Sequence, residues 1–147
     1  MSRSAKDVVI KLLAIRDHSE AELRTKLEQR DFTPDEIEAA LDFGRKSKLL
    51  APPDALSERI AENLHRASKG IEYINQYLEK KGLSSVSSTP ELELEKALVI
   101  LRSQNPDELS GEEKKKWQGK MARKLVSRGF SEDVIRKVIY GDNEIYD

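Results

Sequence analysis

The sequence has 147 residues and a formal net charge of −1, with 36% charged and 5% aromatic residues. This composition is typical of a helix-rich chain with small apolar clusters, and it excludes a fold built around one large core. Cysteine is absent, which excludes disulfide and thiol chemistry and fits a reducing compartment. No apolar run approaches the ~18 residues of a membrane span, and the N-terminus lacks the apolar stretch of a secretion signal. We therefore expect a cytoplasmic protein that is not bound to a membrane.

The first predicted unit spans residues 1–51 and consists of three helices joined by short turns. Ser19 and Glu22 have the capping-box spacing, in which two side chains satisfy the exposed amides of the first helical turn. They predict the start of the second helix. Thr33 and Glu36 repeat this spacing and predict the start of the third helix.

A six-residue signature closes the second helix of this unit and returns twice along the chain. It has a leucine, a basic residue three positions later and an apolar residue five positions later, as in Leu27–Phe32, Leu78–Leu83 and Leu125–Phe130. The copies lie 51 residues apart from Leu27 to Leu78 and 47 residues apart from Leu78 to Leu125. A repeat of about this period indicates a stacked array of helical units.

The second predicted unit spans residues 52–88. It begins at Pro52 and Pro53, because two consecutive prolines do not fit inside a helix. Its third helix is degenerate, since the serine-rich segment 84–88 predicts a loop or a frayed turn between units.

The third predicted unit spans residues 89–141 and opens with Thr89 as a helix cap. Ser110 and Glu113 predict the cap of a long second helix. The recurrence of apolar residues every four positions predicts the buried side of this helix, which comprises Trp117, Met121 and Leu125. Residues 142–147 are expected to form a loose acidic tail.

These residues, in this order, resemble the RecX family of regulators of the RecA recombinase. The part that carries the resemblance most strongly is Arg16-x-His18-Ser19-x-x-Glu22-Leu23-x-x-Lys26-Leu27-x-x-Arg30-x-Phe32. Further support comes from Lys80–Leu83 and from Arg128–Ser131. The resemblance covers nearly the whole chain. It implies an all-α fold of three tandem three-helix, helix-turn-helix-like repeats in an elongated curved array.

The same resemblance implies a bacterial regulator of DNA recombination, DNA repair and the SOS response. Such a protein binds in the helical groove of a RecA filament on DNA and most often inhibits the recombinase, ATPase and co-protease activities. Some members of the family also bind single- or double-stranded DNA directly. We accordingly expect a monomer whose partner is RecA.

The sequence offers no arrangement of residues for catalysis or for a cofactor. It has no Ser-His-Asp order that fits a triad and no glycine-rich phosphate loop. Its two histidines, His18 and His65, are too few for a metal site. We expect no enzyme activity, no cofactor and no metal.

Aligning the repeats on their shared leucine predicts which side chains lie on equivalent outer faces of the second helices. The candidate contact residues for a partner or nucleic acid are Lys26, Arg30, Tyr73, Tyr77, Lys80, Lys81, Lys116, Lys120, Arg123, Lys124 and Arg128. If the units stack side by side, these faces form one continuous row. For the first two repeats, an ordinary solvated face, complementarity to the helix dipole or partial burial of the tyrosines explains the same residues.

The third repeat carries the strongest local signal. Seven basic residues and no acidic residue occur between Lys114 and Arg128, whereas ordinary solvated helices mix the two signs. Such a face can meet phosphates or an acidic protein groove. Two alternatives to a RecA regulator remain open, namely a stand-alone DNA-binding protein of helix-turn-helix type and a helical-repeat adaptor for another protein.

Overall fold

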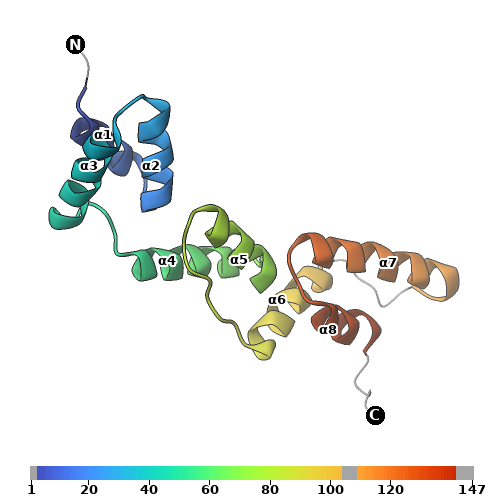
Figure 1. The fold of residues 1–147 in the computed structure, drawn as a ribbon. Helices are drawn as coiled ribbons and strands as arrows, with labels where there is room; N and C mark the ends of the chain where they lie inside the picture. The colour runs from blue at the N-terminus through green and yellow to red at the C-terminus, as the bar shows by residue number, and fades with distance from the viewer. Residues whose placement is uncertain (1–2, 104–108, 142–147) are drawn as a thin grey trace. The chain divides into compact units, whose positions relative to one another are not determined.

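A computed structural model describes residues 3–103 and 109–141, and in these ranges all regular structure is helical (Figure 1). The helices are α1 (Ala5–Ile15), α2 (Glu20–Gln29), α3 (Pro34–Lys46), α4 (Pro53–Arg66), α5 (Ile71–Lys80), α6 (Pro90–Arg102), α7 (Gly111–Ser127) and α8 (Glu132–Ile135), followed by the π-helical turn η2 (Arg136–Tyr140). The all-helical fold agrees with the expectation. The predicted tail, residues 142–147, lies outside the described residues.

Side-chain caps fix the starts of several helices. Ser19 with Glu22 and Thr33 with Glu36 form complete capping boxes, which confirms both predictions. The prediction for α7 is wrong: Ser110 precedes the helix, but its side chain makes no capping hydrogen bond. The backbone enters α7 through Gly111, which has a left-handed φ of 58°, so the chain does not follow the usual cap geometry there.

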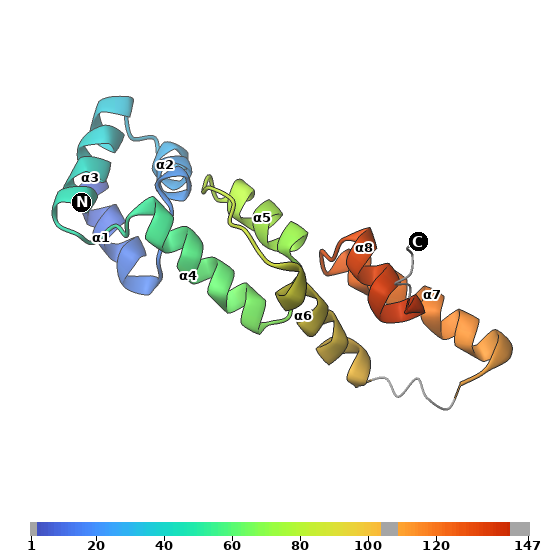
Figure 2. The same ribbon diagram turned by 90° about the horizontal axis from the view of Figure 1, so that it is seen from below.

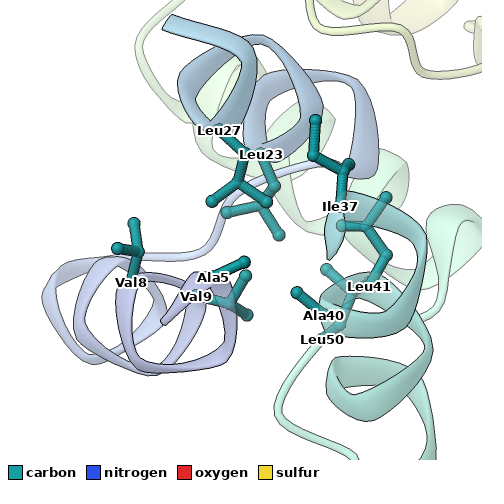
Figure 3. Packing of buried hydrophobic residues seen from close by; sticks show 9 residues of the cluster. All are labelled: Ala5, Val8, Val9, Leu23, Leu27, Ile37, Ala40, Leu41 and Leu50. Atoms are coloured by element: carbon teal, nitrogen blue, oxygen red, sulfur yellow. The ribbon is translucent and has the colours of Figure 1, made fainter. Parts of the chain in front are cut away.

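The described residues fall into two compact units, one made of residues up to 60 together with 78–84, and the other of 61–77 together with those from 85 onward. The boundary falls within α4 and α5. In the first unit α1, α2 and α3 pack against one another, and Figure 3 shows their side chains converging on one cluster. The members of this cluster are Ala5, Val8, Val9, Leu23, Leu27, Ile37, Ala40, Leu41 and Leu50.

The second unit has its own core between α6, α7, α8 and η2. Two views show these elements lying together (Figures 1 and 2). The buried residues of this cluster are Ala97, Ile100, Leu101, Met121, Leu125, Phe130, Val134, Ile135 and Ile139. Trp117 packs against the cluster with its side chain partly buried, so the predicted apolar side of α7 is confirmed.

The repeated signature of the sequence is a helix C-cap. The amides of Phe32, Leu83 and Phe130 donate to the carbonyls of Leu27, Leu78 and Leu125, with N–O distances of 3.3, 2.9 and 3.0 Å. The residue before each donor is left-handed, with φ of 65° at Asp31, 73° at Gly82 and 92° at Gly129. This is the six-to-one bond of the Schellman motif, which also brings the two apolar ends of the signature together. Residues 83–89, which include the serine-rich segment, lie outside the helices.

Candidate functional site: the second helices of the repeats

The candidate residues of α2 are held by local hydrogen bonds. Lys26 is half-buried, with its Nζ 3.0 Å from Nε2 of His18. Nδ1 of His18 lies 3.0 Å from the carbonyl oxygen of Arg16, so a neutral ring can donate to this carbonyl and accept from the lysine. Burial lowers the pKa of His18, which favours that neutral ring. Arg30 is exposed, and its guanidinium donates to the Lys26 carbonyl at 3.0 Å.

The two candidate lysines at the end of α5 have different surroundings. Lys80 is exposed. The Lys81 ammonium instead lies 2.9 Å from a carboxylate oxygen of Glu22, at the start of α2. The Lys81 carbonyl accepts a hydrogen bond from the Ser19 hydroxyl. A Cβ added at Gly82 would lie less than 3.0 Å from the Cβ of Ala21. Lys81 and Gly82 therefore form a close joint with the start of α2 inside the first unit.

Glu22 is the polar centre of this joint. Its carboxylate also accepts from Arg16 at 2.9 Å and from the Ser19 amide at 3.1 Å. Burial opposes its ionisation, but hydrogen bonds from Arg16, Lys81 and Ser19 outweigh burial and lower its pKa to about 2. Ionised Glu22 thus ties the end of α5 to the start of α2.

We expect Glu22→Gln to destabilise the first unit by about 2–3 kcal/mol at neutral pH, because the amide that replaces the carboxylate carries no charge for the two cations. The folded-state pKa lies below the ordinary value of 4.5, so the contribution of Glu22 is present above pH 4.5. It is lost as pH falls towards about 2. Urea unfolding followed by circular dichroism at several pH values measures this difference. Glu38→Gln, which removes an exposed ion pair with Arg24, is the control and should cost at most about 1 kcal/mol. Equal losses for both variants would contradict the joint's role.

The equivalent joint in the second unit is made by backbone. Arg128 and Gly129, at the end of α7, meet the start of α5. The Gly70 amide donates to the Arg128 carbonyl at 2.7 Å, and the Glu72 amide donates to the Gly129 carbonyl at 3.1 Å. A Cβ at Gly70 would lie less than 3.0 Å from Gly129, and a Cβ at Gly129 less than 3.0 Å from Tyr73. Because Gly70 and Gly129 lack side chains, the backbone at the end of α7 packs directly against the backbone at the start of α5.

The candidate tyrosines lie on α5, one turn apart. Tyr73 is half-buried, and the Lys69 ammonium lies 4.6 Å from the centre of its ring. This is a cation–π contact within the protein. Tyr77 is 37% exposed. The structure thus gives Tyr73 an internal partner and leaves part of Tyr77 accessible.

The remaining candidates lie on α7 or at its C-terminal end, and three of them form its outward face. Lys116, Lys120 and Arg123 are exposed, and their spacing places them on the side of the helix opposite Met121 and Leu125. Lys124 is half-buried beside the core, and Arg128 is half-buried at the joint with α5. Within the described residues, none of the three exposed cations is paired with a carboxylate, whereas Lys115 lies 4.0 Å from Glu112. We call Lys116, Lys120 and Arg123 the basic face of α7.

A buried ionic network in the second unit was not anticipated from the sequence. Glu93 and Lys96 on α6 are each only 5% exposed, and their charged groups lie 2.7 Å apart. Glu93 accepts from the Ile71 amide at 2.9 Å and from the Ser88 hydroxyl at 2.7 Å. It therefore caps α5, whose preceding residue, Gly70, has no side chain to do so. Glu93 lies four residues before the buried Ala97, and Lys96 lies four residues before the buried Ile100. This spacing places both charged residues on the buried face of α6, and it is the sequence signal that could have predicted their burial.

The Lys96 ammonium completes the network. It donates to the Lys69 carbonyl at 2.6 Å and lies 2.8 Å from Nδ1 of His65. Burial lowers the pKa of Lys96. Burial and the nearby ammonium also lower the pKa of His65, which favours a neutral ring that can accept a hydrogen bond from Lys96. On Glu93, burial opposes ionisation, but hydrogen bonds from Lys96 and Ser88 lower its pKa. The network joins α4, α5 and α6 within the second unit.

Over residues 3–103 and 109–141, no group of three or more potential ligands is placed to hold a metal ion. In the same ranges, no helix combines the length and the apolar character needed to cross a bilayer.

Comparison with known proteins identifies the family. The family model described as the first three-helix domain of RecX matches residues 5–43. A regulatory protein RecX from Leptothrix cholodnii is 34% identical over 147 aligned residues, covering 92% of this chain and 87% of the relative. The chain belongs to the RecX family. A second RecX, from Haemophilus influenzae, is 32% identical and covers 98% of this chain and 97% of its own length.

The fold is also that of solved RecX structures. The crystal structure of RecX from Lactobacillus salivarius superposes with a TM-score of 0.77 at 20% identity and covers 93% of both chains. A second RecX crystal structure gives a TM-score of 0.71 and covers 94% of this chain. The expected RecX membership and its all-α fold of tandem three-helix repeats are confirmed. The chain is thus a RecX-type regulatory protein.

Proposed function

We propose that this RecX protein binds RecA filaments on DNA, within their helical groove, and inhibits their recombinase, ATPase and co-protease activities. It does so as a cytoplasmic monomer that carries out no chemistry of its own. The observation that carries the proposal is membership in the RecX family, with a regulatory protein RecX matched over 92% of the chain. The RecA filament is the partner that the sequence resemblance implies.

The structure supplies a surface suited to such a role. The three exposed cations of α7 produce a local positive field although the net charge of the chain is −1. Such a field speeds the encounter with an anionic surface. Exposed Arg30, Lys80 and Tyr77 lie at the ends or outer faces of α2 and α5 and supply further weak contacts. In a filament of repeated subunits, later contacts form within the same complex, so several weak patches add up to useful affinity.

ATP hydrolysis by RecA on single-stranded DNA tests this proposal. We expect substoichiometric amounts of the purified protein to lower the hydrolysis rate by at least about twofold, because one bound copy contacts several protomers. Filament length, measured in electron micrographs, should fall in parallel. An unchanged rate together with unchanged length would contradict the proposal.

Direct DNA binding is a second candidate, favoured by the acid-free run of seven basic residues from Lys114 to Arg128. It requires affinity for DNA without RecA and a steep loss of that affinity with salt, because bound phosphates release counterions. Binding to labelled DNA at two salt concentrations separates it from the first proposal.

A further inference from the structure

Gly119 lies between Lys116 and Arg123 along the basic face of α7, and no neighbour among the described residues requires a glycine there. Gly119 lies three residues after Lys116 and four before Arg123, so it shares their outward side. A Cβ at this position would meet only the Arg123 guanidinium, at an ordinary contact distance of 3.5 Å. Glycine in a helix interior lowers helix stability relative to alanine. Packing within the described residues therefore does not account for Gly119.

The surroundings of Gly119 combine charge with an apolar side chain. Lys116, Lys120 and Arg123 are exposed, and Val126, on the same side of the helix, is 63% exposed. Because glycine has no side chain, position 119 is a low point on the helix surface, and among the described residues only the flexible Arg123 guanidinium lies over it. An approaching group can therefore come nearer to the helix axis here than at positions that carry a side chain.

The chemistry of this low point favours a polypeptide over a nucleic acid. In mid-helix the amide and carbonyl of Gly119 are engaged along the helix, so the position offers space but no free amide for a phosphate. Space for close backbone approach is what small residues provide between polypeptide segments. Val126 adds apolar contact that a phosphate backbone does not use, while the three cations are complementary to carboxylates.

We propose that the outward face of α7, centred on Gly119, docks an acidic polypeptide segment of the protein partner. The backbone of this segment crosses α7 at the glycine, and its carboxylates meet Lys116, Lys120 and Arg123. This inference rests on the proposed function, which takes the RecA filament as the partner.

The test introduces a side chain at position 119 that blocks close approach and also stabilises the helix. Gly119→Leu should weaken binding to RecA filaments on single-stranded DNA by about tenfold or more, measured by fluorescence anisotropy of the labelled full chain. The same variant should raise the melting temperature by about 2–4 °C, because leucine is a better helix former. Gly119→Ala should give a similar thermal gain and a smaller loss of binding.

Asn63→Ala is the matched control. Asn63 is exposed on α4 in the same compact unit, and its replacement raises helix propensity without adding bulk to α7. It should preserve wild-type binding. If Gly119→Leu also preserves wild-type binding, or lowers the melting temperature, the docking inference is wrong while the proposed function stands.

Two further outcomes separate the remaining possibilities. If Gly119→Leu causes the same loss on single-stranded DNA without RecA, the occupant is a nucleic acid and the inference of a polypeptide is overturned. If the wild-type protein does not bind the filament at all, the proposed function fails and this inference fails with it.

Discussion

Gly129→Ala is expected to destabilise the second compact unit by more than about 3 kcal/mol, for two reasons that act together. Gly129 has a φ of 92°, a region that costs an L-residue roughly 1–2 kcal/mol. In addition, the new Cβ would lie less than 3.0 Å from the backbone of Tyr73. The backbone joint between the end of α7 and the start of α5 must then open. The single tryptophan of the chain, Trp117, lies in this unit, so its fluorescence during urea unfolding reports the effect.

Alanine substitutions at two other glycines separate the conformational cost from the cost of the close contact. Gly111 is also left-handed, with φ of 58°, but no atom of residues 3–103 and 109–141 lies within 4 Å of its would-be Cβ. Gly111→Ala should therefore show only the conformational cost of about 1–2 kcal/mol. Gly70→Ala introduces the close contact with Gly129 without a left-handed φ, so it isolates the contact. If Gly129→Ala unfolds at the same urea concentration as Gly111→Ala, the close joint contributes nothing and this interpretation is wrong.

Lys96→Met is expected to destabilise the second unit by about 3–5 kcal/mol, because it leaves the buried Glu93 carboxylate without its cation. Both residues are only 5% exposed, so water does not replace the lost partner. Urea unfolding followed by Trp117 fluorescence measures the loss. Lys115→Met, at a side chain that is 77% exposed, is the control and should cost less than about 1 kcal/mol.

The double variant Lys96→Met/Glu93→Gln extends this test. Glutamine can still accept from the Ile71 amide without carrying a buried charge, so the double variant should recover part of the loss. If Lys96→Met costs no more than Lys115→Met, the buried ion pair does not hold α4, α5 and α6 together.

Local patterns predicted most of the helices. The signature that begins at Leu27, Leu78 and Leu125 marks the same C-cap in each repeat because its bonds join residues only five positions apart. The capping boxes at Ser19 and Thr33 are equally local and were predicted correctly. The predicted Ser110 cap was wrong because the left-handed Gly111 changes how the chain enters α7.

Such local patterns do not predict contacts between residues that lie far apart in the sequence. Lys81 was selected as a candidate partner contact, but its ammonium meets Glu22, 59 residues away. Glu93 caps the amide of Ile71, 22 residues away, and no local signal indicates that pairing. By contrast, the basic face of α7 is a property of one helix, and spacing alone predicts a stripe of Lys116, Lys120 and Lys124 with Arg123. The structure leaves three of these side chains exposed and half-buries Lys124 beside the core. The continuous row across the three repeats stays a prediction.

The most direct test of RecA regulation through α7 is an ATP-hydrolysis titration with a charge-reversed protein. Lys116→Glu/Lys120→Glu/Arg123→Glu changes the outward face and should require about tenfold more protein to inhibit RecA on single-stranded DNA. The control, Lys11→Glu/Arg102→Glu/Lys137→Glu, makes the same change in net charge at exposed positions outside α7 and should inhibit like the wild type. Equal inhibition by the two triple variants would contradict the role of α7.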